Sequence, residues 1–464
     1  MTKNIKIVML GICFMAGGLF AQDAKAPEKK WYDKVEFSGF VDVYYQYNTN
    51  NKQGANVDGS RPFTTYNKQF GVNSVELAVE KAADKESPWG FRINFMNGQN
   101  AMFQENGYTT TNQVFNMNLL QEGYVSFYFN VLNGLTVDVG KMATHIGYEL
   151  IESMDNPNYT IGYIFFNTIP FIHTGARASL SINDKWGFNF YLYNSAKGTG
   201  FSEPTEANLT NGNVHTYADG PNKARAIGTQ LSGELSSKLS VVWNTVYGSD
   251  NETARRSNMD YFIQQNNAQL ASNTRPNSWN HDYWFVNEII LSISPTDKLT
   301  VDLDWTYGEK KGTDAGANEG VDRQVTLEDG SQPTLPLNRD GRNARTIYNT
   351  YGVWAKYTIN DKFLLALRYE YIDDSRNGGA LGTSGNIPQF RYDLQYMNST
   401  FGSKQNYGTQ VRTFTVTPTY NWSDNMIIKL DLRRDWALGY QFVDEQGRPA
   451  SYQNGATLGI VAKF

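Results

Sequence analysis

Short runs of alternating apolar and polar residues fill the chain, and six of them end in a tight polar turn that the next run follows at once. The six turns are Ala83-Asp84-Lys85, Leu132-Asn133-Gly134, Asn183-Asp184-Lys185, Pro295-Thr296-Asp297-Lys298, Asn360-Asp361-Lys362 and Ser423-Asp424-Asn425. Long excursions rich in Gly, Asn, Thr and Ser separate them, at 98–119, 195–224, 250–280, 311–344 and 373–409. Short and long connections therefore alternate. This pattern predicts a strand meander with tight turns at one end and long loops at the other.

The alternating runs have one apolar and one polar face. In 426–436 the apolar face holds Met426, Ile428, Leu430, Leu432 and Trp436, and the polar face holds Lys429, Asp431, Arg433 and Asp435. The runs 299–307, 363–371 and 411–420 divide in the same way. Alternation over ~8–10 residues is the span that a tilted membrane strand needs. Counting runs from Val35 to Phe464 gives about sixteen strands, so the sequence predicts an all-β fold, a transmembrane antiparallel up-and-down β-barrel.

A soluble β-sandwich would also alternate, but its connections would not switch so regularly between short and long. The apolar faces here end in Tyr, Trp or Phe, as the aromatic girdles at two membrane interfaces do. Aromatic residues make up 14% of the chain, which favours strands as well. The net charge of −5 is mild and argues against nucleic acid as a partner.

The N-terminus predicts export. Two lysines precede an apolar run at 7–20, and small residues around Ala21 follow it. The run is shorter than the ~20 residues of a membrane-spanning helix, which disfavours an uncleaved anchor. The predicted division is a signal peptide at 1–21, a short periplasmic tail at 22–34 and an outer-membrane barrel at 35–464. The only cysteine, Cys13, falls in the signal peptide, so no disulfide is expected in the exported chain.

The connection at 143–173 differs from the other long ones because it is dense in large apolar residues, among them Ile151, Tyr159, Phe165 and Phe171. Loops exposed to water do not have this composition. We therefore expect this segment to bury its apolar side against the inner barrel wall. It follows the fifth expected strand, 135–142, and is the third long connection. Folding inward there would narrow the pore.

Charged groups on this loop and on the inward strand faces predict a pore constriction. Its predicted members are His145, Glu149, Glu152, Asp155 and His173 on the loop, facing Lys356, Arg368, Lys429 and Arg433 across the lumen. Opposed acidic and basic walls would create a transverse field that orients dipolar solutes. The alternative is that these are ordinary solvated lumen charges. Inward positions of the early strands are mainly acidic, namely Glu36, Asp42, Glu76, Glu80 and Asp138. We therefore expect weak cation preference, screened within ~8 Å at physiological salt.

Motifs in and around this loop resemble a known family. They are Gly140-Lys141, His145-Ile146-Gly147-Tyr148-Glu149, Asp155-Asn156-Pro157-Asn158-Tyr159-Thr160 and Pro170-Phe171-Ile172-His173-Thr174-Gly175-Ala176-Arg177. The region resembles the signature of the putative β-barrel porin-2 family, also called OmpL-like, and the resemblance implies an outer-membrane porin. A Ser-Arg pair expected after Asn158-Tyr159 is Thr160-Ile161 here, which departs from the family pattern.

The last run alternates up to Phe464 and stops there, which resembles the assembly signal of outer-membrane proteins. It implies the barrel assembly machinery as a partner. The other expected partners are outer-membrane lipid and small hydrophilic solutes, and the sequence leaves open whether the barrel forms a homo-oligomer.

These features predict a passive diffusion channel for small hydrophilic solutes in the bacterial outer membrane. The alternative is a non-transport surface barrel, such as an adhesin, a structural anchor or a component of a secretion complex. No enzyme, cofactor or metal is expected. The four histidines, His145, His173, His215 and His281, have no nucleophile motif beside them and no tight metal-ligand spacing.

Overall fold

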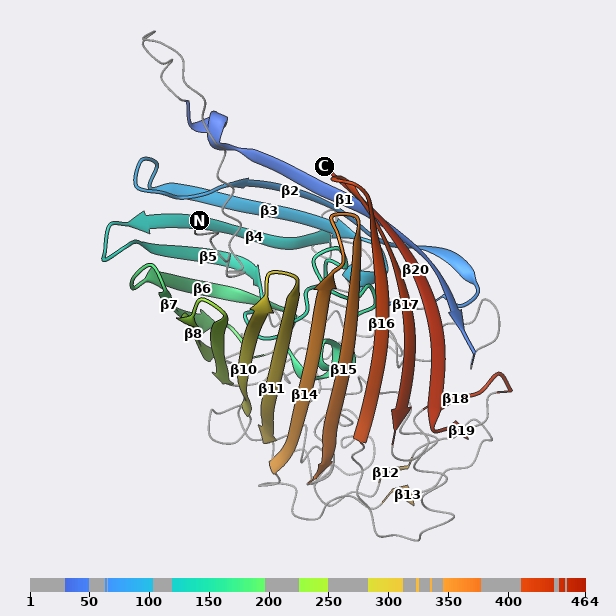
Figure 1. Ribbon diagram of the computed structural model, residues 1–464. Coiled ribbons are helices and arrows are strands. Elements are labelled where there is room, and N and C mark those ends of the chain that lie inside the picture. The colour runs from blue at the N-terminus through green and yellow to red at the C-terminus, as the bar shows by residue number, and fades with distance from the viewer. Residues whose placement is uncertain are drawn as a thin grey trace, which may run out of the picture.

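Sixteen strands form one closed antiparallel barrel, in which each strand pairs with its neighbours in chain order (Figure 1). The computed structural model describes residues 30–49, 63–64, 66–102, 119–196, 225–248, 283–311, 323–324, 334–335, 345–376, 410–437, 442–446 and 449–464. The expected signal peptide, His215 and His281 lie outside these residues. The predicted up-and-down barrel of about sixteen strands is confirmed.

The barrel strands are β1 (Glu36–Asn48), β2 (Gln69–Lys81), β3 (Trp89–Asn97), β4 (Leu120–Phe129), β5 (Leu135–Ala143), β6 (Ile172–Ser181), β7 (Trp186–Tyr193), β8 (Ala226–Ser236), β9 (Leu239–Gly248), β10 (Tyr283–Thr296), β11 (Leu299–Lys311), β14 (Arg345–Thr358), β15 (Phe363–Arg376), β16 (Gln410–Ser423), β17 (Met426–Ala437) and β20 (Tyr452–Lys463). Two small two-stranded sheets lie outside the barrel: β12 (Arg323–Gln324) with β13 (Thr334–Leu335), and β18 (Phe442–Val443) with β19 (Pro449–Ala450). The helices are η1 (Trp31–Lys34), α1 (Gln99–Met102) and α2 (Tyr163–Thr168).

Barrel closure brings the first and last strands together. β1 pairs antiparallel with β20, and the amide of Phe464 donates a hydrogen bond of 3.0 Å to the carbonyl of Gly39. The start of β1 and the end of β20 therefore lie at the same end as the short turns. We call this the turn end, and the opposite end, where the long connections leave the strands, the loop end.

All six predicted turns join neighbouring strands at the turn end. The structure adds a seventh turn at 237–238, between β8 and β9. The sequence analysis missed it because Ser236-Ser237-Lys238 contains no Asp, Asn, Gly or Pro to mark a turn.

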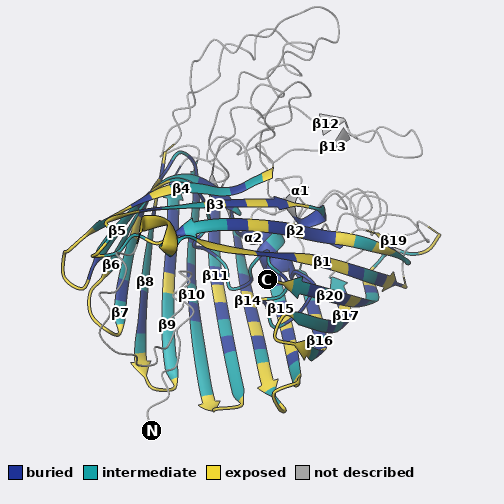
Figure 2. Cartoon of the chain, turned by 90° about the horizontal axis from the view of Figure 1, so that it is seen from above, coloured by how far each residue is buried: buried dark blue, intermediate teal, exposed yellow. Residues whose placement is uncertain are grey.

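The two predicted faces of the strands are confirmed. On β17, the side chains of Asp431 and Asp435 are fully buried, whereas that of Leu432 is 49% exposed. The same alternation runs along the other strands as bands of buried and exposed residues (Figure 2). Large apolar residues such as Trp243, Trp305 and Tyr351 face outward. An apolar outside and a polar inside are what hydrocarbon on one side and water on the other require.

In the described residues, none of the helices is long and apolar enough to cross a bilayer. The tail before the barrel is described from Lys30, and η1 lies at the turn end. Its Lys34 ammonium is 2.9 Å from a carboxylate oxygen of Asp84, in the turn between β2 and β3.

Candidate pore constriction

The connection between β5 and β6, residues 144–171, makes hydrogen bonds to inward-facing groups of distant strands. We call it the lumen loop. The His145 ring lies 2.9 Å from the carbonyl of Thr245 on β9. The amide of Gly147 donates to both carboxylate oxygens of Glu288 on β10, each at 2.9 Å. The first part of the loop thus reaches β9 and β10, the third and fourth strands after β6 in the barrel.

The middle of the lumen loop contacts the opposite wall. Two hydroxyl groups, those of Ser153 and Tyr159, donate to the carboxylate of Asp42 on β1. The amides of Tyr159 and Thr160 donate to the two oxygens of Asp431 on β17, at 3.1 and 2.7 Å. Buried backbone N–H groups need hydrogen-bond acceptors. The Asp431 carboxylate supplies them to a segment that has no regular secondary structure of its own.

The short helix α2 begins against two carboxylates. Glu370 on β15 accepts hydrogen bonds from the amides of Tyr163 and Ile164 at 3.1 and 3.0 Å, and Glu149 accepts one from Gly162 at 2.7 Å. The first amides of a helix have no partner within the helix, so acidic groups there are stabilising. A Cβ atom at Gly162 would lie 2.2 Å from an oxygen of Glu370, which explains why glycine precedes this helix.

Arg368 on β15 joins the loop to the wall through a buried ion pair. Its Nη1 is 2.6 Å from an oxygen of Glu149, and the two side chains are 0% and 1% exposed. Nη1 also donates to the carbonyl of Thr160, and Nη2 donates to the hydroxyl of Thr415 at 3.0 Å. One guanidinium therefore binds both halves of the lumen loop and the neighbouring strand.

Two more of the four predicted basic wall residues, Lys429 and Arg433, contact loop carbonyls. The Lys429 ammonium donates to the carbonyls of Ser153, at 2.8 Å, and Met154, at 3.2 Å. Arg433 donates to the carbonyl of Ile161 at 2.8 Å and pairs with Asp435 at 2.7 Å. The sequence analysis placed Arg368, Lys429 and Arg433 across open space from the loop, whereas the structure places them in direct contact with it.

The two predicted histidines pack among aromatic rings. His145 stacks on Tyr191 and His173 stacks on Tyr193, each with ring centroids 3.9 Å apart. Burial lowers the pKa of His145 to about 4, so its ring is neutral at physiological pH. The histidines anchor the two ends of the lumen loop to β7, and His145 adds no positive charge to the lumen.

Three of the predicted constriction residues remain accessible. Glu152 is half-buried, and Asp155 and Lys356 are exposed. Lys356 shares the inward face of β14 with the buried residues Thr350 and Trp354. The nine predicted residues therefore divide into a buried group that holds the loop and an accessible group of two carboxylates and one ammonium.

The sequence analysis missed the wall carboxylates as partners of the loop. Glu288 and Glu370 had no assigned role, and Asp42 was considered only as a lumen charge. The sequence did indicate that these side chains face the lumen, because alternate residues of a strand point to the same side. Which backbone amides they accept depends on the path of the loop, and that path has no periodic pattern.

A closed antiparallel barrel with an apolar outside and a polar, charged interior defines the class of transmembrane β-barrel channels. The chain belongs to the family described as putative beta-barrel porin-2, OmpL-like, whose model matches residues 34–464. The protein is therefore a porin of the bacterial outer membrane.

No curated protein matches the chain in sequence. Among solved structures, it is similar to an anion-selective porin from Comamonas acidovorans, at 11% identity and a TM-score of 0.49, covering 93% of this chain and 99% of that one. It is similar to the outer membrane channel DcaP of Acinetobacter baumannii, at 10% identity and a TM-score of 0.48, with 93% and 97% covered. It is also similar to Salmonella typhi OmpF in complex with daunomycin, at 11% identity and a TM-score of 0.47, with 93% and 97% covered. At such identities the likeness concerns the fold alone.

Proposed function

We propose that the lumen loop sets the size and charge limits of a passive diffusion channel for small hydrophilic solutes. The observation that carries this proposal is the span of its hydrogen bonds. Donors in the loop, which connects β5 and β6, bind carboxylates of β1, β10, β15 and β17. A segment held to so many walls occupies space that a sixteen-stranded barrel otherwise leaves to water. Passage requires no catalytic group, and we propose no enzymatic activity.

Single-channel recording on purified, refolded protein tests this function. We expect open, steady current steps in a planar bilayer, because the accessible lumen charges keep a wetted path beside the loop. Heat-denatured protein at the same concentration is the control. A correctly folded barrel that carries no current would instead support the non-transport alternative, in which the long connections serve adhesion or anchoring.

We further propose weak cation preference. The accessible carboxylates Glu152 and Asp155 outnumber the accessible ammonium of Lys356, while Arg368 and Arg433 are buried in ion pairs with Glu149 and Asp435. On the early strands, Arg92 pairs with Glu80 and lies 2.6 Å from Glu122, so one guanidinium offsets two carboxylates. Fixed charge of one sign along a pore favours mobile ions of the other.

This preference is expected to weaken as the pH falls from neutral. Glu152 is half-buried, and loss of hydration raises its pKa well above its usual range, with a further rise from the nearby carboxylate of Glu76, so this group loses its charge first as the pH falls. Loss of hydration also raises the pKa of Asp155, against the attraction of Lys429. A raised pKa means that protonation removes these negative charges at a higher pH than for an ordinary carboxyl group.

Reversal potentials across a salt gradient, measured at several pH values, check this expectation. Asp155→Asn should lower the cation preference at neutral pH, and Lys356→Gln should increase it. Asp184→Asn, in an exposed turn at the turn end, is the matched control and should leave it unchanged. Clear anion selectivity of the wild-type channel at neutral pH would contradict the proposal.

The last strand is also expected to serve barrel assembly. β20 pairs with both β1 and β17, and the side chain of Phe464 is 67% exposed beside Gly39. We propose that the assembly machinery recognises this end of the strand. The division of the first 34 residues into a signal peptide and a periplasmic tail stays a prediction.

A further inference from the structure

The outer wall of the barrel has a groove where β3 ends early. The ladder between β2 and β3 stops at the pair Val75–Asn97, whereas β2 continues to Gln69 and stays paired with β1 there. Among the described residues, the first part of β2, at the loop end, therefore has no partner on β3. The wall is locally one strand short on that side.

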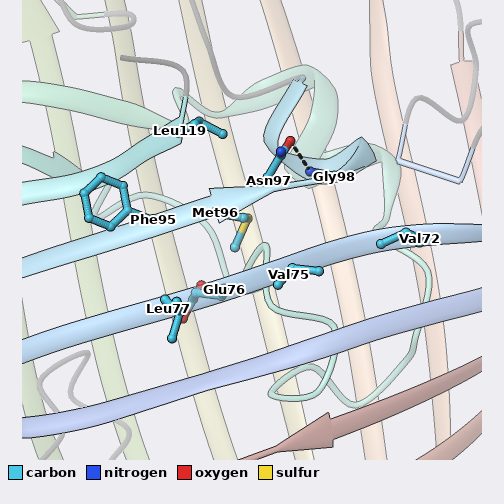
Figure 3. A pocket seen from close by; sticks show the side chains of 9 residues that line it. All are labelled: Val72, Val75, Glu76, Leu77, Phe95, Met96, Asn97, Gly98 and Leu119. Carbon is cyan, nitrogen blue, oxygen red and sulfur yellow. Dashed lines mark hydrogen bonds between the residues drawn. The ribbon is translucent and has the colours of Figure 1, made fainter. Parts of the chain in front are cut away.

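The chain leaves the wall at Gly98. This residue has a φ of +125°, and a Cβ atom on it would lie 2.5 Å from the carbonyl oxygen of Asn73. Only glycine accommodates both the conformation and the close approach. The side-chain oxygen of Asn97 accepts the Gly98 amide at 2.8 Å, which fixes the turn into α1 (Figure 3).

The resulting groove has a volume of about 470 Å³, within the ~300–1,000 Å³ range of ligand pockets. Its walls are mainly apolar side chains of the outward face, Val72, Val75, Leu77, Phe95 and Leu119 (Figure 3). Val72, Val75, Leu77 and Phe95 are 52%, 41%, 54% and 41% exposed, respectively. The groove is therefore continuous with the surface that faces lipid.

We propose that this groove binds one hydrocarbon chain of a lipid in the outer leaflet. An apolar cavity is a poor site for water, and hydrocarbon is the medium in contact with the outward face. No Lys or Arg is among the lining residues, so the groove recognises the chain of the lipid rather than its phosphate. The loop end is the external end of such barrels, which places the groove in the outer half of the membrane.

The groove reaches the level of the strand backbone, because the inward residues Glu76 and Met96 line it together with the outward ones. The carboxylate of Glu76 itself faces the lumen, where the charges of Arg92, Glu122 and Asp155 act on it, so it lies out of reach of a lipid on the outside. The proposed ligand is therefore recognised by its hydrocarbon chain alone.

Native mass spectrometry tests the proposal. The protein is reconstituted in vesicles of phosphatidylethanolamine, whose acyl chains are the probe, and extracted into a mild detergent. We expect wild-type barrels to retain one phospholipid and Val75→Trp barrels, whose indole fills the groove, to retain none. Val353→Trp is the matched control, since Val353 is an outward valine of β14 that is 37% exposed, and it should retain the lipid.

Circular dichroism and single-channel conductance verify that each variant forms an intact barrel. Should Val75→Trp fail to fold, Val72→Trp, at the loop-end rim of the groove, replaces it with the same expected loss. Equal lipid retention in all folded variants would overturn the proposal. So would a loss of oligomers in Val75→Trp without a loss of lipid, which would assign the groove to a second copy of the chain. Neither outcome affects the channel function, because conductance is measured separately.

Discussion

Deletion of residues 149–166 is expected to increase the single-channel conductance severalfold. This segment contains Glu149, the first four residues of α2 and the amides that bind Glu370 and Asp431, so its removal takes most of the lumen loop out of the barrel. A sixteen-stranded barrel without an inward segment encloses an aqueous channel. The exclusion limit for uncharged sugars, measured by liposome swelling, should rise together with the conductance.

The geometry of the loop makes this deletion feasible. A Cβ atom on Gly147 would lie 2.7 Å from the side chain of Ile169, so residues just outside the two ends of the deleted segment are already in contact. The amide of Thr144 donates a hydrogen bond of 3.0 Å to the carbonyl of Phe171, and both residues lie outside the deleted segment. Asp184→Asn, in the exposed turn between β6 and β7, serves as the control and should not widen the channel. Unchanged conductance in the 149–166 variant would refute the constriction model.

Replacement of Arg368 by glutamine is expected to detach the lumen loop. Glu149 would remain buried without its guanidinium, and removing one partner of a buried ion pair typically costs ~3–5 kcal/mol. Thr160 would lose the donor to its carbonyl as well. The expected result is rapid fluctuation of the channel current together with faster hydrogen exchange of the amides of Gly162 and Tyr163, measured by mass spectrometry.

A second substitution separates the charge pair from general damage. The double variant Arg368→Gln/Glu149→Gln leaves no unpaired charge at position 149, whereas Glu370, 3.6 Å from the guanidinium in the wild type, still loses it, so only a part of the lost loop stability should return. Lys356→Gln removes an accessible lumen charge on the adjacent strand and should leave the hydrogen exchange unaffected. If the double variant shows the sum of the two single effects, the ion pair does not hold the loop.

Most of the barrel wall could be predicted from the sequence because its rules are local. A strand with lipid on one side and water on the other must alternate with a period of two, so the faces of β11, β15, β16 and β17 follow directly from their residues. Six turns were visible because Asp, Asn, Gly or Pro marks them. The turn at 237–238 follows the same geometry with serine and lysine, and composition alone gave no sign of it.

Less of the lumen interior could be predicted from the sequence. Apolar composition singled out the segment 143–173, and strand parity identified Arg368, Lys429 and Arg433 as inward residues. Parity could not tell whether these cations face open water or bind the loop, because that depends on how far the loop extends from β5. The result matters for function, since a buried guanidinium 2.6 Å from Glu149 contributes little to the field that a passing ion meets.

The sequence by itself determined the class of protein, the number and order of the strands and the side chains that face lipid, since each depends on neighbours along one strand. The tertiary structure decided which lumen charges hold the loop and which stay accessible, and where β3 ends to leave a groove. The lumen contacts join residues more than 100 positions apart, as in the bonds from Tyr159 to Asp42 and from Gly147 to Glu288. No periodicity along the chain encodes such distances.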